Sequence, residues 1–131
     1  MRMVVIAAML TIMVGRSGVC PVATFTARGA SGRVCYESNA KCIPIPGAHI
    51  ELSDEVGNVI RGASTDQAGA FRIETESPGE FTLKVSANGF RAVECRLIAK
   101  KTGKSDKRLN AVLGSDAILP CGGSRIAEDS K

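Results

Sequence analysis

Five cysteines and a single histidine are the residues of this 131-residue chain whose types could support catalysis or metal binding. No two cysteines have the Cys-x-x-Cys spacing of zinc sites or of thioredoxin-like redox sites. A nucleophilic cysteine needs a histidine partner, and only His49 is available. These counts predict a small non-enzymatic domain with no catalytic residue, no metal ligand and no cofactor.

In an oxidising compartment the cysteines are instead candidates for disulfide bonds. If Cys20 is removed or modified, four cysteines remain, and they allow three pairings. The pairing that we prefer joins Cys35 to Cys42 and Cys95 to Cys121, with contributions of about 2.5 and 3.5 kcal/mol to stability. The alternative is that some of them stay as reduced, buried thiols.

The acidic residues of the turns are too sparse for a calcium site. Asp54 and Glu55 lie in one turn and Asp66 in another. A hard cation needs several carboxylates in one loop, so we expect these to be ordinary turn residues.

The excess positive charge is concentrated in residues 91–108, which carry seven basic and two acidic residues against a net charge of +4 for the chain. The candidates for contact with a polyanion, such as an acidic envelope glycan or an anionic lipid surface, are Lys100, Lys101, Lys104, Lys107 and Arg108. We favour a simpler interpretation, a solvated hairpin between the last two strands whose lysines discourage edge pairing. Nucleic acid is not an expected partner, because no aromatic residues are interleaved with the basic ones.

The start of the chain is typical of an export signal, which we assign to residues 1–19. Arg2 precedes an apolar run over residues 4–14, which is too short to span a bilayer as a helix. The alternative is a buried core helix. Cleavage is expected next to Cys20 or a few residues later.

An exported protein is expected in the periplasm, at the cell surface or outside the cell, with no membrane span once the signal is removed. A lipid anchor on Cys20 is the less favoured alternative, because Ser17-Gly18-Val19 differs from the Leu-Ala-Gly that precedes the cysteine of bacterial lipoproteins. The expected partners are an envelope protein or a glycan.

Alternating apolar and polar residues predict the elements that must position these side chains. Seven short runs after Gly32 have one apolar face each, the pattern of half-buried β-strands. The runs are marked by Val34 and Tyr36; Ala48, Ile50 and Leu52; the segment 59–63; Phe71, Ile73 and Thr75; Phe81, Leu83, Val85 and Ala87; Val93, Cys95 and Leu97; and Leu109, Ala111 and Leu113. Turn residues such as Pro46-Gly47 and Asn88-Gly89 separate the runs.

This pattern predicts an all-β fold, a seven-strand antiparallel β-sandwich over residues 30–114, in which two sheets cover each other's apolar faces. Residues 115–131 are expected to form a tail that Cys121 tethers to the sandwich, with residues 122–131 mobile.

Four ordered motifs resemble those of carboxypeptidase regulatory-like domains. Gly32-Arg33-Val34 with residues 43–52 resembles the opening of that family, and Thr65-Asp66-Gln67-Ala68-Gly69-Ala70-Phe71 resembles its T-D-x-x-G-x-F turn. Ser77-Pro78-Gly79-Glu80-Phe81-Thr82-Leu83 and Ala87-Asn88-Gly89-Phe90 are similar to its P-G-x-Y/F-x-L and A-x-G-F/Y segments. The resemblance implies a transthyretin-like, Ig-like sandwich related to collagen-adhesin B-type repeats and to carbohydrate-binding-like folds.

Elementary chemistry explains these motifs without a ligand. Asp66 can accept hydrogen bonds from its own turn, and Gly69 can adopt the positive φ that the reversal needs. Phe71, Phe81 and Phe90 are then expected to anchor the core.

Enzymes and cross-links on related folds need residues that this chain lacks. Hydroxyisourate hydrolases rely on several His and Arg residues, and intradiol dioxygenases on paired Tyr and His iron ligands, whereas this chain has one Tyr and one His. An isopeptide bond needs a lysine on the first strand, where Arg33 stands, although Asn110 is a possible acceptor. Sugar binding on an aromatic platform is less expected, because the chain has no Trp and its single Tyr, Tyr36, is predicted to point inward.

The sequence therefore predicts a non-enzymatic, exported binding or structural module of the bacterial envelope or the cell exterior. The alternative is a carbohydrate-binding module on the same fold. An enzyme acting through a cysteine or His49 is the least favoured interpretation.

Overall fold

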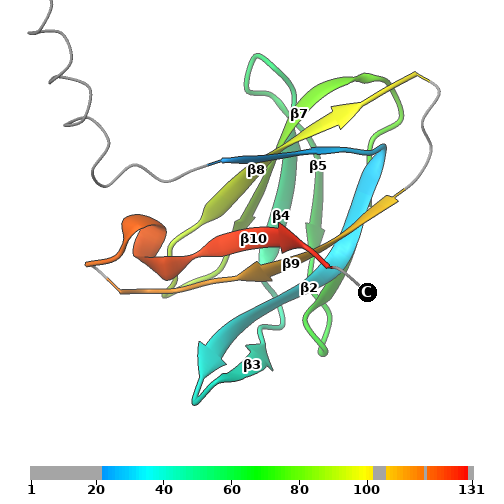
Figure 1. Ribbon diagram of the computed structural model, residues 1–131. Coiled ribbons are helices and arrows are strands. Elements are labelled where there is room, and N and C mark those ends of the chain that lie inside the picture. The colour runs from blue at the N-terminus through cyan, green and yellow to red at the C-terminus, as the bar shows by residue number, and fades with distance from the viewer. Residues whose placement is uncertain (1–21, 102–105, 117, 130–131) are drawn as a thin grey trace, which may run out of the picture.

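The computed structural model describes residues 22–101, 106–116 and 118–129, which form a β-sandwich (Figure 1). In chain order the strands are β1 (Ala23–Thr26), β2 (Gly29–Ser38), β3 (Lys41–Pro44), β4 (His49–Ser53), β5 (Val59–Ser64), β6 (Ala70–Glu74), β7 (Gly79–Ser86), β8 (Val93–Ala99), β9 (Asp106–Val112) and β10 (Arg125–Glu128), with a short 3-10 helix, η1 (Pro120–Gly123), before the last. The predicted all-β sandwich is confirmed, and the seven predicted runs correspond to β2 and β4 to β9. Strands β1, β3 and β10 are additional, and each has only four residues.

The strands form two sheets. The first has the order β1-β8-β7-β4-β5, and the second has the order β10-β9-β2-β3, with β6 also paired to β2. Strand β2 organises the second sheet, because its first half pairs with β6 and its second half with β3, while β9 lies along its other edge.

The sandwich is not purely antiparallel, because β1 pairs with β8 and β2 with β9 in parallel. Parallel neighbours need a crossing connection rather than a tight hairpin. Strand β8 belongs to the first sheet and β9 to the second, so the basic segment between them is not the hairpin that the sequence predicted.

The core lies between the inner faces of the two sheets and is mainly aliphatic. Its largest fully buried side chains are Ile50, Leu52, Leu83, Leu97, Leu109, Leu113, Val34, Val85 and Cys95. Phe71 and Phe81 are buried as predicted, with 6% and 7% of their surface exposed. Phe90 is only half-buried at the margin of the core, where its ring centroid lies 5.5 Å from that of Tyr36. The prediction of three central phenylalanines is therefore right for two of them.

The turn between β5 and β6 is held by its own side chains, as predicted. The Asp66 Oδ1 atom accepts hydrogen bonds from the backbone N–H groups of Ala68 and Ala70, both at 2.9 Å. Gly69 has a φ of +76°, a conformation that glycine adopts without strain.

The C-terminal segment is more ordered than the sequence suggested. Strand β10 pairs with β9, and Ile126 inserts into the core. The connection before it is held by Ser124, whose hydroxyl donates to the Arg91 carbonyl at 2.7 Å and accepts from the Gly114 N–H at 2.9 Å. The expectation of a mobile tail is thus wrong for residues 125–128, where one buried isoleucine and a strand ladder fix the chain.

Candidate functional site

One disulfide bond closes the hairpin of β2 and β3. It joins Cys35 and Cys42, whose Cα atoms are 5.5 Å apart, in agreement with the preferred pairing. The bond lies on the outer side of the second sheet, with Cys35 buried and Cys42 exposed.

The predicted bond between Cys95 and Cys121 is wrong. Cys95 is a free thiol in the core, between the inward side chains of Val93 and Leu97 on β8. Cys121 is disulfide-bonded, and Cys95 is not its partner. Burial, with a smaller contribution from the negative charge of Glu94, raises the pKa of the Cys95 thiol from its ordinary value of 9.0 to about 12. Cys95 therefore stays protonated and acts as a small apolar core residue.

His49 and the Cys95 thiol point away from opposite faces of the first sheet. It is exposed on the outer face of the first sheet, across from Ser64 on β5 and Ser86 on β7, whereas the Cys95 side chain faces inward from the same sheet. The two residues that sequence reasoning considered for catalysis thus lie on opposite faces.

The acidic turn residues cap their own turns. Asp54 Oδ1 accepts from the N–H groups of Val56 at 3.1 Å and Asn58 at 2.9 Å, in the same manner as Asp66. Across the described ranges, no three His, Cys, Asp or Glu residues are grouped so that they could hold a metal ion.

The predicted basic residues that the structure describes lie at the end of β8 and on β9. Lys100 and Lys101 are exposed beyond the end of β8, and Lys104 lies outside the described residues. The Lys107 Nζ atom pairs with Glu128 Oε2 at 3.4 Å, whereas Arg108 points from β9 to the outer face of the second sheet. Lys107 and Arg108, as successive residues of β9, thus point toward opposite faces of the second sheet.

Instead, arginines from four strands meet on the outer face of the second sheet, a feature that sequence reasoning missed. They are Arg33 on β2, Arg72 on β6, Arg108 on β9 and Arg125 on β10, all exposed. Each alternates with an inward apolar residue, so each side chain was predictable as outward. Their convergence depends on β6 and β9 both pairing with β2, which no local pattern specifies.

Two of these arginines already bind carboxylates. Arg72 lies 3.3 Å from both Glu74 and Asp106, and Arg125 lies 2.9 Å from Glu37 on β2. Arg33 and Arg108 have no ion-pair partner among the residues that the structure describes.

A hollow of about 840 Å³ lies between Arg33 and Arg108. We call it the arginine hollow and define it by Ser31, Arg33, Ala70, Arg108 and Asn110, which are among its lining residues. In register, Ser31 lies between Arg72 and Arg108, and Arg33 lies between Ala70 and Asn110. The face is hollowed here because the side chains of Ser31 and Ala70 are small.

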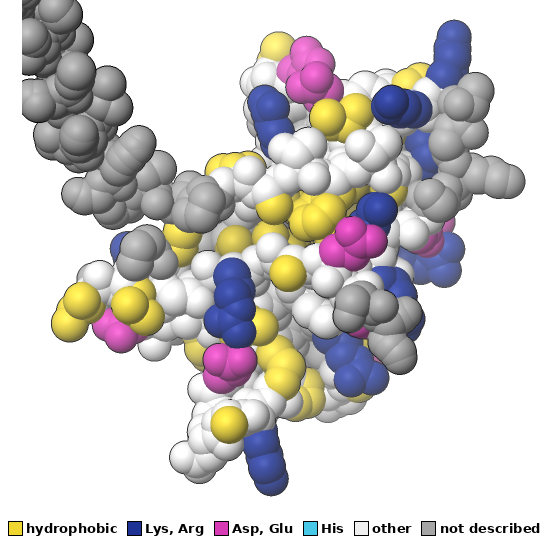
Figure 2. Space-filling model, viewed as in Figure 1, with side chains coloured by type: hydrophobic (Ala, Val, Ile, Leu, Met, Phe, Trp, Pro, Cys, Tyr) yellow, Lys and Arg dark blue, Asp and Glu magenta, His cyan; other side chains and the backbone are white. Residues whose placement is uncertain are grey.

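The floor of the arginine hollow requires a glycine. Gly32 lies beneath it, and a Cβ at that position would overlap the backbone carbonyl of Leu109, so only glycine permits this approach of β2 to β9. The Cys35–Cys42 disulfide lines one end, and Asp129 also contributes to the lining. In Figure 2, Lys and Arg side chains gather to the right of the view, beside the starts of β2 and β9.

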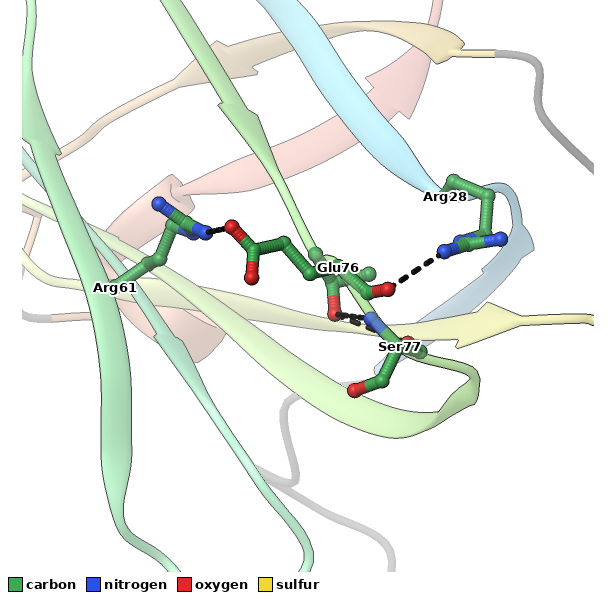
Figure 3. A network of polar contacts seen from close by, with 5 residues as sticks. Arg28, Arg61, Glu76 and Ser77 are labelled. Carbon is green, nitrogen blue, oxygen red and sulfur yellow. Dashed lines mark hydrogen bonds and ion pairs between the residues drawn. The ribbon is translucent and has the colours of Figure 1, made fainter.

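A separate polar network ties the two sheets together at the surface (Figure 3). Arg61 of β5 pairs with the Glu76 carboxylate at 2.7 Å, and Arg28 donates to the Glu76 carbonyl at 2.9 Å. The Glu76 side chain is 84% exposed, so this pair adds little to stability and encloses no site.

Solved structures are similar to this chain. The 5-hydroxyisourate hydrolase of Klebsiella pneumoniae is similar, with a TM-score of 0.53 and 16% sequence identity over 78% of this chain and 99% of that chain. Catechol 1,2-dioxygenase from Pseudomonas arvilla C-1 gives a TM-score of 0.39 with 14% identity, over 83% of this chain and 55% of the dioxygenase. No curated protein sequence matches the chain.

The described residues include no helix long and apolar enough to cross a membrane. The family model for the carboxypeptidase regulatory-like domain matches residues 29–114, from the start of β2 to just beyond the end of β9. The chain belongs to the carboxypeptidase regulatory-like domain family.

Proposed function

We propose that the protein is a non-enzymatic, exported module that binds its target through the outer face of the second sheet. The observation that carries this proposal is the arginine hollow, where Arg33 and Arg108 have no ion-pair partner among the described residues beside a recess on a rigid sheet. Charged groups held in place on strands bind a ligand at a low cost in ordering.

The placement of the reactive residues supports a non-enzymatic role. Covalent catalysis by a cysteine requires a thiolate within hydrogen-bonding reach of a base. The Cys95 thiol is buried with its pKa raised to about 12, and His49 is on the opposite face of the sheet. The similar hydrolase acts on 5-hydroxyisourate, so that compound is the substrate to test first.

Export is supported by the Cys35–Cys42 disulfide, because such bonds persist in oxidising compartments outside the cytosol. The expected locations remain the periplasm, the cell surface and the cell exterior, in the bacterial envelope or beyond it.

A carbohydrate-binding role is the second candidate, and the hydrogen-bonding groups of the arginine hollow favour it. The Ser31 hydroxyl and the Asn110 amide lie on the same face as the two arginines. Such groups bind sugar hydroxyls without an aromatic platform.

Two measurements test the proposed function. Purified protein should be retained by isolated envelope fractions or by an array of neutral and acidic glycans, and the double variant Arg33→Gln/Arg108→Gln should be retained less. Arg96→Gln, which changes an exposed arginine on the first sheet, is the matched control. Equal retention of all three proteins, or none, would contradict the proposal. Hydrolysis of 5-hydroxyisourate that His49→Ala abolishes would overturn its non-enzymatic part.

A further inference from the structure

We infer that the arginine hollow binds the carboxylates of an acidic polysaccharide. This inference rests on the proposed binding function and specifies its ligand class. It does not involve the lysine-rich segment that the sequence first suggested, because only Arg108 of that segment lies in the arginine hollow.

The basic side chains of this face are arginines rather than lysines, and arginine favours a ligand oxyanion with two acceptor atoms. All four basic side chains on the outward positions of β2, β6, β9 and β10 are arginines. The planar guanidinium group donates two parallel hydrogen bonds to a carboxylate, a geometry that lysine cannot reproduce.

The same face already shows which anion suits it. Arg72 and Arg125, which flank the arginine hollow, are both paired with carboxylates, at 3.3 Å and 2.9 Å. The two arginines inside it stand at equivalent outward positions of neighbouring strands. A carboxylate that enters the hollow would therefore meet the type of contact that its neighbours already make.

The spacing of the two arginines favours a polymer over a small anion. Arg33 pairs in register with Asn110, two residues beyond Arg108 on the same strand. The Cα atoms of Arg33 and Arg108 are therefore separated by about 7 Å along the strands and about 5 Å across them. Two arginines at this spacing bind a polymer with repeated carboxylates better than they bind one small anion.

The surroundings argue for a sugar polymer rather than a lipid surface. The exposed large apolar side chains of the described residues are Val22, Val56, Val59, Ile60, Ile118 and Leu119. None of them lines the arginine hollow, so nothing there would insert into a bilayer. Ser31 and Asn110 instead offer a hydroxyl and an amide to sugar hydroxyl groups.

Calorimetric titration of the purified protein with polygalacturonate tests the inference, with dextran, inorganic phosphate and phosphatidylglycerol vesicles as alternative ligands. We expect each of Arg33→Gln and Arg108→Gln to lower the affinity for polygalacturonate about fivefold to tenfold, and both together at least about 30-fold. Arg96→Gln should change it less than twofold. Added salt should weaken binding.

The inference is overturned if the double variant binds polygalacturonate as the wild type does, or if phosphate or vesicles bind as tightly as polygalacturonate. Circular dichroism and urea denaturation of each variant separate a loss of binding from a loss of folding. If dextran binds and the double variant loses that binding, the ligand class is wrong but the proposed function stands. If no ligand binds here and envelope fractions do not retain the protein, both fail.

Discussion

Replacement of Thr65 by valine should destabilise the sandwich more than any change of similar size on its surface. Thr65 is buried at the end of β5, with 6% of its surface exposed. Its hydroxyl accepts a hydrogen bond from the Ala48 N–H at 2.8 Å and donates one to the Ile45 carbonyl at 2.6 Å. One side chain thus joins the start of β4 to the end of β5.

The magnitude follows from these two bonds. Valine has nearly the same shape but no hydroxyl, so the substitution removes both bonds and leaves the Ala48 N–H and the Ile45 carbonyl without that partner. Each bond contributes about 1 kcal/mol, and an unsatisfied buried group costs about 1–3 kcal/mol. We expect the free energy of unfolding to fall by about 2–4 kcal/mol, against a typical total of about 5–15 kcal/mol.

Urea denaturation followed by circular dichroism measures this difference, and Thr65→Ser is the matched control. Serine keeps the hydroxyl and loses one methyl group, so it should cost only about 1 kcal/mol. With a urea slope of about 1–3 kcal/mol per molar, valine should lower the midpoint by about 1–3 M. A midpoint close to the wild type, or serine as costly as valine, would refute the role of the hydroxyl.

Three further predictions concern the turns and the core. In urea denaturation, Gly69→Ala should lower the free energy of unfolding by at least about 1 kcal/mol more than Gly57→Ala. Both glycines have positive φ, but only at Gly69 would a Cβ lie 2.6 Å from the Val34 carbonyl oxygen. Equal losses of stability would contradict this. Ala40 has a φ of +64°, so Ala40→Gly should raise the thermal midpoint, with a gain of about 0.5–1 kcal/mol; a lower midpoint would contradict it. Between pH 9 and 12 the unfolded chain loses the Cys95 proton while the folded chain keeps it. The free energy of unfolding of the wild type should therefore fall, relative to Cys95→Ala, by up to about 1.4 kcal/mol per pH unit. Parallel pH profiles of the two proteins would show that the thiol is not desolvated.

Local pattern was sufficient to predict the sandwich. Strands such as β7 alternate apolar and polar residues with period two, and the buried positions Phe81, Leu83 and Val85 are the ones that this alternation indicates. The turn chemistry of Asp66 and Gly69 was equally predictable, because both residues act within a few positions of themselves.

The short strands could not be predicted, because four residues give too little alternation to distinguish a strand from a loop. Strand β10 is held by one inward residue, Ile126, and by its pairing with β9. Strand β1 depends on its parallel pairing with β8, about 70 residues later in the chain. Both depend on tertiary contacts.

The disulfide pairing was likewise predictable only where the two cysteines are close in the chain. Cys35 and Cys42 are joined across a hairpin, so their proximity is local. The inward position of Cys95 was visible in the alternation of β8, yet the expectation of a bond to Cys121 disregarded it. An inward thiol between apolar neighbours is more simply a core residue.

The candidate site depends on sheet order, and this is why the sequence pattern did not indicate the arginine hollow. Clustering along the chain drew attention to residues 100–108, whereas the cations that converge are Arg33 and Arg108, which are far apart in sequence. Only the parallel pairing of β2 and β9 places them on one face.

The most direct test of the account is an NMR titration of ¹⁵N-labelled protein with polygalacturonate. The account predicts that the amide shifts move for residues 31–33 and 108–110, with the first sheet unchanged, and that Arg33→Gln/Arg108→Gln abolishes these shifts. Shifts confined to the outer face of the first sheet around His49, or none at millimolar polymer, would contradict the claim that the arginine face is the binding surface.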